Sequence, residues 1–190
     1  MTINNIIFNY FNKKSDQHKR KIGKFWATDV YKIKSGQLTV ENFFDQPEVS
    51  WSDIGNIFTG LAYERELMYI LNQTDTPHKS HRKKSIVISR GIVIVSNLDI
   101  MFPGAIAEIK APTKLKTEIP EWYKDQAEIY HRTWKKDVYF YFFVPRSLTG
   151  VYNKLIIEKK YKPSDVRWNN IKTLLIDFNK QLKLYYDQKD

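Results

Sequence analysis

The 190-residue sequence contains no cysteine. This absence excludes disulfide bonds, thiolate zinc sites, cysteine nucleophiles and cysteine-ligated iron–sulfur clusters. Any metal ion must therefore be bound by oxygen or by imidazole nitrogen. The four histidines lack the mutual spacing of a metal site, and His78 and His81, within a basic run, are better explained by solvation or by phosphate contact.

Long apolar runs are also lacking. No stretch is long enough to cross a bilayer, and the N-terminal residues MTINNIIFNYFNKK lack the pattern of a signal peptide. We therefore expect a soluble, intracellular, cytoplasmic protein without a membrane partner. The length suits a single domain, and no repeat or low-complexity linker divides it. We expect a basic N-terminal region over 1–26, a core over about 27–160 and a C-terminal helix over about 164–187.

Acidic residues are too few to balance the basic ones. The chain has 31 lysines and arginines against 21 aspartates and glutamates, a formal net charge of +10. Such an excess suggests an anionic partner, and nucleic acid is the first candidate. Lysines that only keep the protein soluble would explain any single basic cluster equally well. Basic clusters occur at 13–24, 78–84 and 110–116. The predicted nucleic-acid contacts within them are Lys79, Arg82, Lys83, Lys84 and Lys114.

Hydrophobic periodicity and turn residues predict alternating helices and strands. The expected helices cover 27–36, 52–71, 120–134 and 164–187, with Ser52 as a candidate N-cap. The expected strands cover 85–89, 92–102, 105–110 and 137–144, with 151–158 as a further candidate. Turn signals at Arg90-Gly91 and Pro103-Gly104 join the first three strands into an antiparallel meander. This order predicts an α/β fold with a small mixed β-sheet flanked by helices.

Charged residues interrupt two of these apolar strands. Glu108 and Lys110 lie two apart, so they project from the same face, and the turn before them can bring Asp99 alongside. Buried charges need a partner or a metal ion. Two carboxylates suit Mg²⁺ or Mn²⁺, while the amine can hold and polarise a water molecule. A cross-strand ion pair without a metal would also explain the pattern.

Polar residues on two expected helices accompany this cluster. Glu64 falls inside the apolar face of the helix over 52–71. Gln126 and Tyr130 lie one turn apart on the helix over 120–134, where neighbouring backbone could also satisfy them. Trp122 lies near the same place and is a candidate for base stacking.

Taken in order, these residues resemble the PD-(D/E)XK nuclease superfamily. The series reads Gly60-Leu-Ala-Tyr-Glu64, then Asp99, then Glu108-Ile-Lys110, then Gln126-Ala-Glu-Ile-Tyr130. Its last element is similar to that of the RecB-like branch, which includes CRISPR-associated RecB-type nucleases and phage λ-type exonucleases. The resemblance covers roughly residues 27–145 and implies a restriction-endonuclease-like core.

The resemblance also implies a metal site for the hydrolysis of phosphodiester bonds. Asp99, Glu108 and the carbonyl of Ile109 would bind one or two Mg²⁺ or Mn²⁺ ions, and Glu64 would complete the set directly or through water. Many RecB-like members carry histidine where this chain has Glu64, so Glu66 is an alternative. Several relatives also hold an iron–sulfur cluster through four cysteines, which this chain cannot do.

Three residues would act on the substrate according to the same resemblance. Lys110 would orient and activate the attacking water and stabilise the developing negative charge. Gln126 and Tyr130 would hold the scissile phosphate or an adjacent nucleotide.

The expected function is therefore that of a metal-dependent DNA nuclease. The pair Gln126 and Tyr130 resembles a branch dominated by end-dependent enzymes, so we expect an exonuclease acting on single-stranded or frayed DNA ends. Recombination, repair and the processing of viral or mobile-element DNA are the expected settings. Three alternatives stay open: an endonuclease or junction or flap nuclease of the same superfamily, a catalytically silent nucleic-acid-binding module, and a structural interaction protein.

Overall fold

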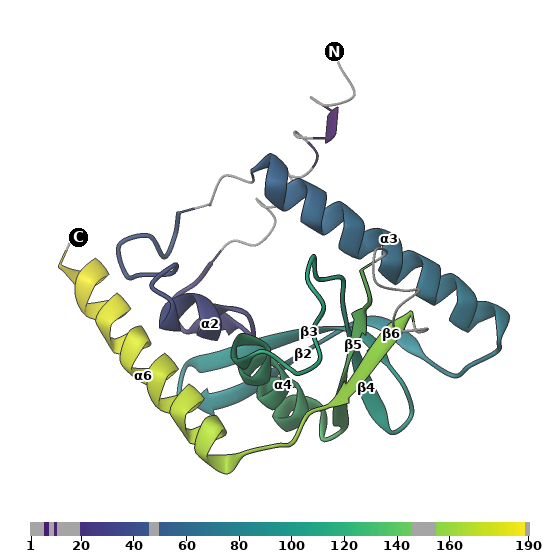
Figure 1. Cartoon of the computed structure of the whole chain (residues 1–190). Helices are drawn as coiled ribbons and strands as arrows, with labels where there is room; N and C mark the ends of the chain where they lie inside the picture. Colours follow the sequence, from purple (N-terminus) through teal and green to yellow (C-terminus); the bar gives the residue numbers. More distant parts are fainter. Residues whose placement is uncertain (1–5, 8–9, 11–19, 46–49, 146–154, 189–190) are drawn as a thin grey trace.

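A computed structural model describes residues 6–7, 10, 20–45, 50–145 and 155–188. Within them lies one mixed, six-stranded β-sheet flanked by helices, which confirms the expected fold class (Figure 1). The strands are β1 (Lys24–Trp26), β2 (Lys79–Ser89), β3 (Ile92–Met101), β4 (Ala105–Lys110), β5 (Asp137–Phe143) and β6 (Ile156–Lys160). The helices are α2 (Asp29–Lys34), α3 (Trp51–Gln73), α4 (Glu121–Trp134) and α6 (Asp165–Asp187).

The sheet combines a meander with a crossover. Strands β2, β3 and β4 pair antiparallel, as the two turn signals predict. Helix α4 then carries the chain back so that β5 runs parallel to β4, and β6 pairs antiparallel with β5. Strand β1 pairs in parallel with β3. A helical crossover is the usual way to join parallel neighbours, which explains why α4 lies across the sheet beside β4 and β5.

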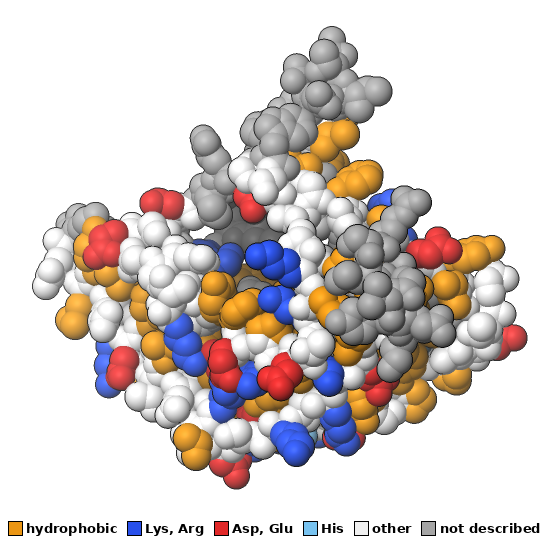
Figure 2. All heavy atoms as spheres, in the orientation of Figure 1, with side chains coloured by type: hydrophobic (Ala, Val, Ile, Leu, Met, Phe, Trp, Pro, Cys, Tyr) orange, Lys and Arg blue, Asp and Glu red, His pale blue; other side chains and the backbone are white. Residues whose placement is uncertain are grey.

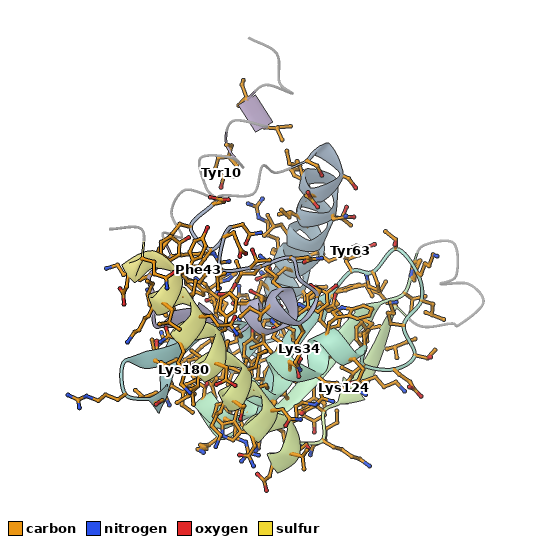
Figure 3. The ribbon with its side chains drawn as sticks, turned by 90° about the vertical axis from the view of Figure 1, so that its left-hand side faces the viewer. Tyr10, Lys34, Phe43, Tyr63, Lys124 and Lys180 are labelled. Carbon is orange, nitrogen blue, oxygen red and sulfur yellow. The ribbon has the colours of Figure 1, made fainter. Side chains whose placement is uncertain are left out.

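The larger core lies between the sheet and helices α2, α4 and α6. Alternate residues of β5 enter it, because Val138, Phe140 and Phe142 share one face of the strand. Tyr123 of α4 stacks on Phe140, with ring centroids 5.6 Å apart. Phe43 packs near α6, as Figure 3 shows. This packing fixes α4 against the strands that carry the charged residues.

Helix α3 covers a different part of the sheet. A second apolar cluster contains Ala107 and Ile109 of β4, and Tyr63 and Leu67 of α3 pack against it. Residues that alternate along a strand face opposite sides, so Glu108 points away from this cluster. In Figure 1, α3 accordingly lies apart from α2, α4 and α6. Strand β4 therefore turns an apolar face to α3 and a charged face to α4.

Several element boundaries differ from the sequence predictions. Strand β1 belongs to the sheet although it precedes the expected start of the core at 27, because Phe25 is fully buried beside β3. Strand β2 begins at Lys79 rather than at 85, since it pairs with β3 as far as Met101. Much of the expected N-terminal region, and 151–154 of the last candidate strand, lie outside the described residues.

The N-cap of α3 is also placed differently. Ser50, not Ser52, caps the helix, in a capping box with Asp53. Among the helices that the structure describes, none combines the length and apolar character needed to cross a membrane.

Candidate active site

Asp99 and Glu108 lie side by side on neighbouring strands. The paired residues Ile100 and Ala107 end the β3–β4 ladder, and Asp99 and Glu108 follow directly, both on the opposite face of the sheet from that pair. Oδ2 of Asp99 accepts a hydrogen bond from the backbone N–H of Ile109 at 2.8 Å. Glu108 is only 2% exposed. The expected carboxylate pair therefore exists, at the point where the β3–β4 ladder meets α4.

The two carboxylate oxygens of Glu108 have different surroundings. Oε1 accepts hydrogen bonds from Lys110 Nζ at 2.5 Å and from Gln126 Nε2 at 2.9 Å. Oε2 is also buried, but no residue in the described part of the chain donates to it. A buried carboxylate oxygen normally has a partner. An unpaired oxygen beside a second carboxylate is an arrangement that a hard divalent cation can complete.

Gln126 and Tyr130 support Glu108 from α4. Gln126 Nε2 also donates to the hydroxyl of Tyr130 at 2.7 Å, and that hydroxyl donates to the carbonyl of Asn97 at 2.6 Å. Gln126 is 7% exposed and Tyr130 is 2% exposed. Both side chains are thus held within the protein interior. These contacts hold Glu108 in place, and the expected contact of Gln126 and Tyr130 with a substrate phosphate stays a prediction.

Burial and mutual charge shift the pKa values of this cluster. Burial raises the pKa of Glu108 to about 7, and the negative charge of Asp99 raises it as well. Lys110 and Gln126 oppose this shift, because their contacts with Glu108 lower its pKa. Burial alone would lower the pKa of Lys110, but Glu108 and Asp99 outweigh it and raise that pKa above its ordinary value. Lys110 is thus held as an ammonium ion, suited to stabilising negative charge rather than to accepting a proton.

The charged cluster opens into a cavity of about 590 Å³. Its lining includes Asp99, Glu108 and Lys110 together with Trp26, Lys32 of α2 and Lys83 of β2. Lys83 Nζ lies 4.4 Å from the centroid of the Trp26 ring. Figure 2 shows a hollow on one face of the molecule with Lys and Arg atoms at its edge. The cavity thus places cations around the two carboxylates, as an anionic ligand requires.

The predicted nucleic-acid contacts are distributed unevenly around this cavity. Only Lys83 among them belongs to its lining. Lys79 and Arg82 are exposed on β2, and the ammonium of Lys84 lies over the ring of Trp134 at 5.6 Å. Lys114 is exposed in the segment between β4 and α4. The basic run over 78–84 is thus mostly strand, and its residues contact different surroundings.

The structure does not bring Glu64 to Asp99 and Glu108. Glu64 is on α3, and its Oε1 lies 3.4 Å from Nε2 of His81 on β2. In the described part of the chain, no three acidic or histidine side chains converge on a possible metal position. The expected role of Glu64 in the ligand set is therefore not matched here, since α3 packs on the other face of β4. Glu66 is exposed on the same helix.

Sequence reasoning missed one wall of the cavity. Arg20 lines it and makes two hydrogen bonds of 2.9 Å to the buried carboxylate of Asp29, which also accepts from the backbone N–H of Trp26. Lys32 follows on α2. These residues carry no motif, and only the pairing of β1 with β3 brings them opposite Glu108.

Comparisons with known proteins bear on the fold. No protein-family model and no curated protein matches the sequence. Among solved structures, SSO0001 is 15% identical, with a TM-score of 0.71 over 96% of this chain and 88% of its own. The alkaline exonuclease LHK-Exo from Laribacter hongkongensis is 13% identical, with a TM-score of 0.63 and 97% of both chains covered. This chain has the fold of that exonuclease.

A further match supports the same assignment of the fold. A phage related exonuclease from Haemophilus somnus 129PT is 12% identical, with a TM-score of 0.58 over 93% of this chain and all of its own. LHK-Exo has also been solved in complex with dAMP. At such low identity the likeness establishes the nuclease-like fold, and the chemistry must be argued from the site itself.

Proposed function

We propose that the protein is a metal-dependent DNA nuclease that hydrolyses phosphodiester bonds. The observation that carries the proposal is the state of Glu108, a buried carboxylate with one unpaired oxygen beside Asp99 and Lys110. This cluster lies in a cavity with basic walls and on a fold shared with exonucleases. A buried acceptor without a partner costs free energy, so the unpaired oxygen favours a bound cation over an ion pair made only for stability.

The residues present fit a divalent cation. Asp99, Glu108 and the backbone carbonyl of Ile109 would hold Mg²⁺ or Mn²⁺, since both prefer oxygen ligands. Such an ion, when bound, supplies charge neutralisation at the phosphate and lowers the pKa of a water molecule. The raised pKa of Glu108 reflects the like charge of Asp99 after burial, a repulsion that a cation relieves.

The remaining residues of the cluster have separate roles. Lys110, held as an ammonium ion, orients the attacking water and stabilises the negative charge that develops on the phosphate. Gln126 and Tyr130 are positioning residues that fix one oxygen of Glu108, which leaves the other for the cation. The hydrogen bond from Ile109 fixes Asp99 in the same way.

We propose DNA ends as the substrate. Two cations of the cavity, Lys32 and Lys83, are available to follow a phosphate backbone past the carboxylates, whereas Arg20 is engaged by Asp29. Support for an exonuclease comes from the named activities of LHK-Exo and of the phage related exonuclease. Single-stranded or frayed ends are the proposed form, because Glu108 is buried and a single strand enters a recessed site more easily than a duplex does.

Digestion of end-labelled DNA tests this function. Linear single strands, linear duplexes and closed circular single strands are incubated with Mg²⁺ or Mn²⁺, with Asp99→Asn as the inactive control. Linear strands should be shortened progressively, and circular strands should be cut much more slowly. Equal rates on circles would indicate an endonuclease or flap nuclease instead. Absence of cleavage with Mn²⁺ would leave a binding module and refute the enzymatic proposal.

A further inference from the structure

Two exposed aromatic rings meet outside the cavity. Tyr31 on α2 is 37% exposed and Trp122 on α4 is 42% exposed. Their ring centroids lie 6.2 Å apart with an interplanar angle of 44°. Lys116 adds a cation, since its Nζ lies 5.6 Å from the centroid of the Trp122 ring. Exposed aromatic rings beside a cation offer flat faces on which a nucleic-acid base can stack.

This aromatic pair is adjacent to the candidate active site on both sides. Tyr31 immediately precedes Lys32, which lines the cavity. Trp122 immediately precedes Tyr123, whose ring centroid is 4.9 Å from the ammonium of Lys110. Consecutive Cα atoms are only about 3.8 Å apart. Both rings therefore belong to residues next in the chain to Lys32, which lines the cavity, and to Tyr123, which contacts Lys110.

The junction between α2 and α4 is held in place below the rings. Lys34 Nζ donates to Oδ2 of Asp125 at 2.7 Å, and Arg167 of α6 donates to Oδ1 at 2.9 Å. Lys34 lies one helical turn from Tyr31, and Asp125 lies one turn from Trp122, so the ion pair runs alongside the ring contact. Figure 3 shows Lys34 between these helices. The two rings are thus fixed before any ligand arrives.

We propose that Tyr31 and Trp122 form a base-stacking platform for an unpaired nucleotide of the strand whose phosphate occupies the cavity, with Lys116 contacting the backbone. The identity of that strand as DNA rests on the proposed function. Base–aromatic stacking is tolerant of sequence and needs an exposed base face, which a paired and stacked duplex does not offer. The platform would therefore select single-stranded or frayed DNA. Stacking on the platform would also require that the substrate strand has at least one further nucleotide beyond the bond that is cleaved.

Binding without catalysis tests the platform directly. The full-length protein in excess chelator is titrated with a fluorescent oligothymidylate and with an abasic oligomer of equal length and charge. Tyr31→Ala and Trp122→Ala should each raise the Kd for oligothymidylate roughly fivefold or more and leave that for the abasic oligomer nearly unchanged. Lys116→Ala should weaken both by the same factor. Tyr69→Ala, which removes an exposed ring on α3, is the matched control and should alter neither.

Conservative variants separate stacking from folding. Trp122→Leu keeps apolar contact with α2 but offers no ring, whereas Trp122→Phe keeps one. The Leu variant should lose the preference for bases, and the Phe variant should retain most of it. Equal losses on both oligomers, or none on either, would mean that the rings only pack α2 against α4 and would overturn the platform. Absence of binding to either oligomer by the unaltered protein would overturn the DNA-binding function as well.

Discussion

Replacing Glu108 by glutamine should make the metal-free protein more stable near pH 8. Glu108 has a pKa raised by burial from 4.5 to about 7, so its ionised form is disfavoured in the folded state. The stability contributed by this shift is fully present below about pH 4.5. It is lost as the pH rises to about 7, because the folded protein must then give up a proton that it binds more tightly than the unfolded chain.

The size of the effect follows from the two pKa values. A rise from 4.5 to about 7 corresponds to a loss of about 3 kcal/mol. Glutamine stays neutral at every pH, so Glu108→Gln avoids the loss. About 3 kcal/mol is an upper value for the gain in stability. In the variant, the ammonium of Lys110 no longer faces a negative charge at 2.5 Å, which lowers the stability. For a chain of this size it amounts to a rise in Tm of roughly 6–12 °C.

Added metal should reverse the order of the two proteins. Mg²⁺ or Mn²⁺ stabilises any folded state that binds it, so the Tm of the unaltered protein should rise with metal concentration. Glu108→Gln lacks the oxygen proposed as a ligand and should show little or no such rise. The carboxylate of Glu108 would then lower the stability of the folded protein without metal and raise it with metal bound.

Thermal unfolding from pH 4 to 8 in chelator measures the effect of the Glu108 pKa on stability. The same series with Mn²⁺ measures the stabilisation by metal. The two proteins should have similar Tm values near pH 4 in chelator and diverge as the pH rises. Glu66→Gln removes an exposed carboxylate on α3 and should behave as the unaltered protein does throughout. A Glu108→Gln protein that is less stable at pH 8 in chelator would refute the assigned pKa. One that keeps the full response to Mn²⁺ would refute the metal site.

Three further predictions test the neighbouring residues. Lys110→Ala should lower turnover roughly a hundredfold or more with DNA affinity nearly unchanged, and near-normal cleavage would contradict its role. Gln126→Leu removes a hydrogen bond that lowers the pKa of Glu108, so the Mn²⁺-induced rise in Tm should require a higher pH; an unchanged pH profile would count against positioning. Lys83→Ala should reduce the slope of log Kd for single-stranded DNA against log salt by about 0.7. Lys180→Ala, which removes an exposed cation of α6 that does not line the cavity, should leave the slope unchanged.

Local pattern was sufficient to predict most of the elements. The helix at 164–187 is close to α6, and the strand at 137–144 is close to β5, because each has a strong period or an unbroken β-prone run. The turn at Pro103-Gly104 correctly predicted that β3 and β4 pair antiparallel. Strand β1 could not be predicted, because three residues hold no periodic signal and their burial depends on β3.

The sequence by itself determined that Glu108 and Lys110 share a face and that Asp99 can join them, since the period of a strand and a short turn are local properties. It also determined, through the absence of cysteine, that a metal must take oxygen or nitrogen ligands. Only the tertiary structure decided which helix meets that face. Packing in the larger core places α4 against Glu108, so that Gln126 donates a hydrogen bond to it. Packing in the second core places α3 on the opposite face of β4, where Glu64 lies near His81.

The walls of the cavity were decided in the same way. Arg20, Lys32 and Lys83 come from three separate segments, and nothing in their local sequence distinguishes them from the other basic residues of a chain with a net charge of +10. Long-range pairing of β1 and β2 with β3 selects them, because a charge contributes to a site through its distance from the other charges and not through its position in the chain.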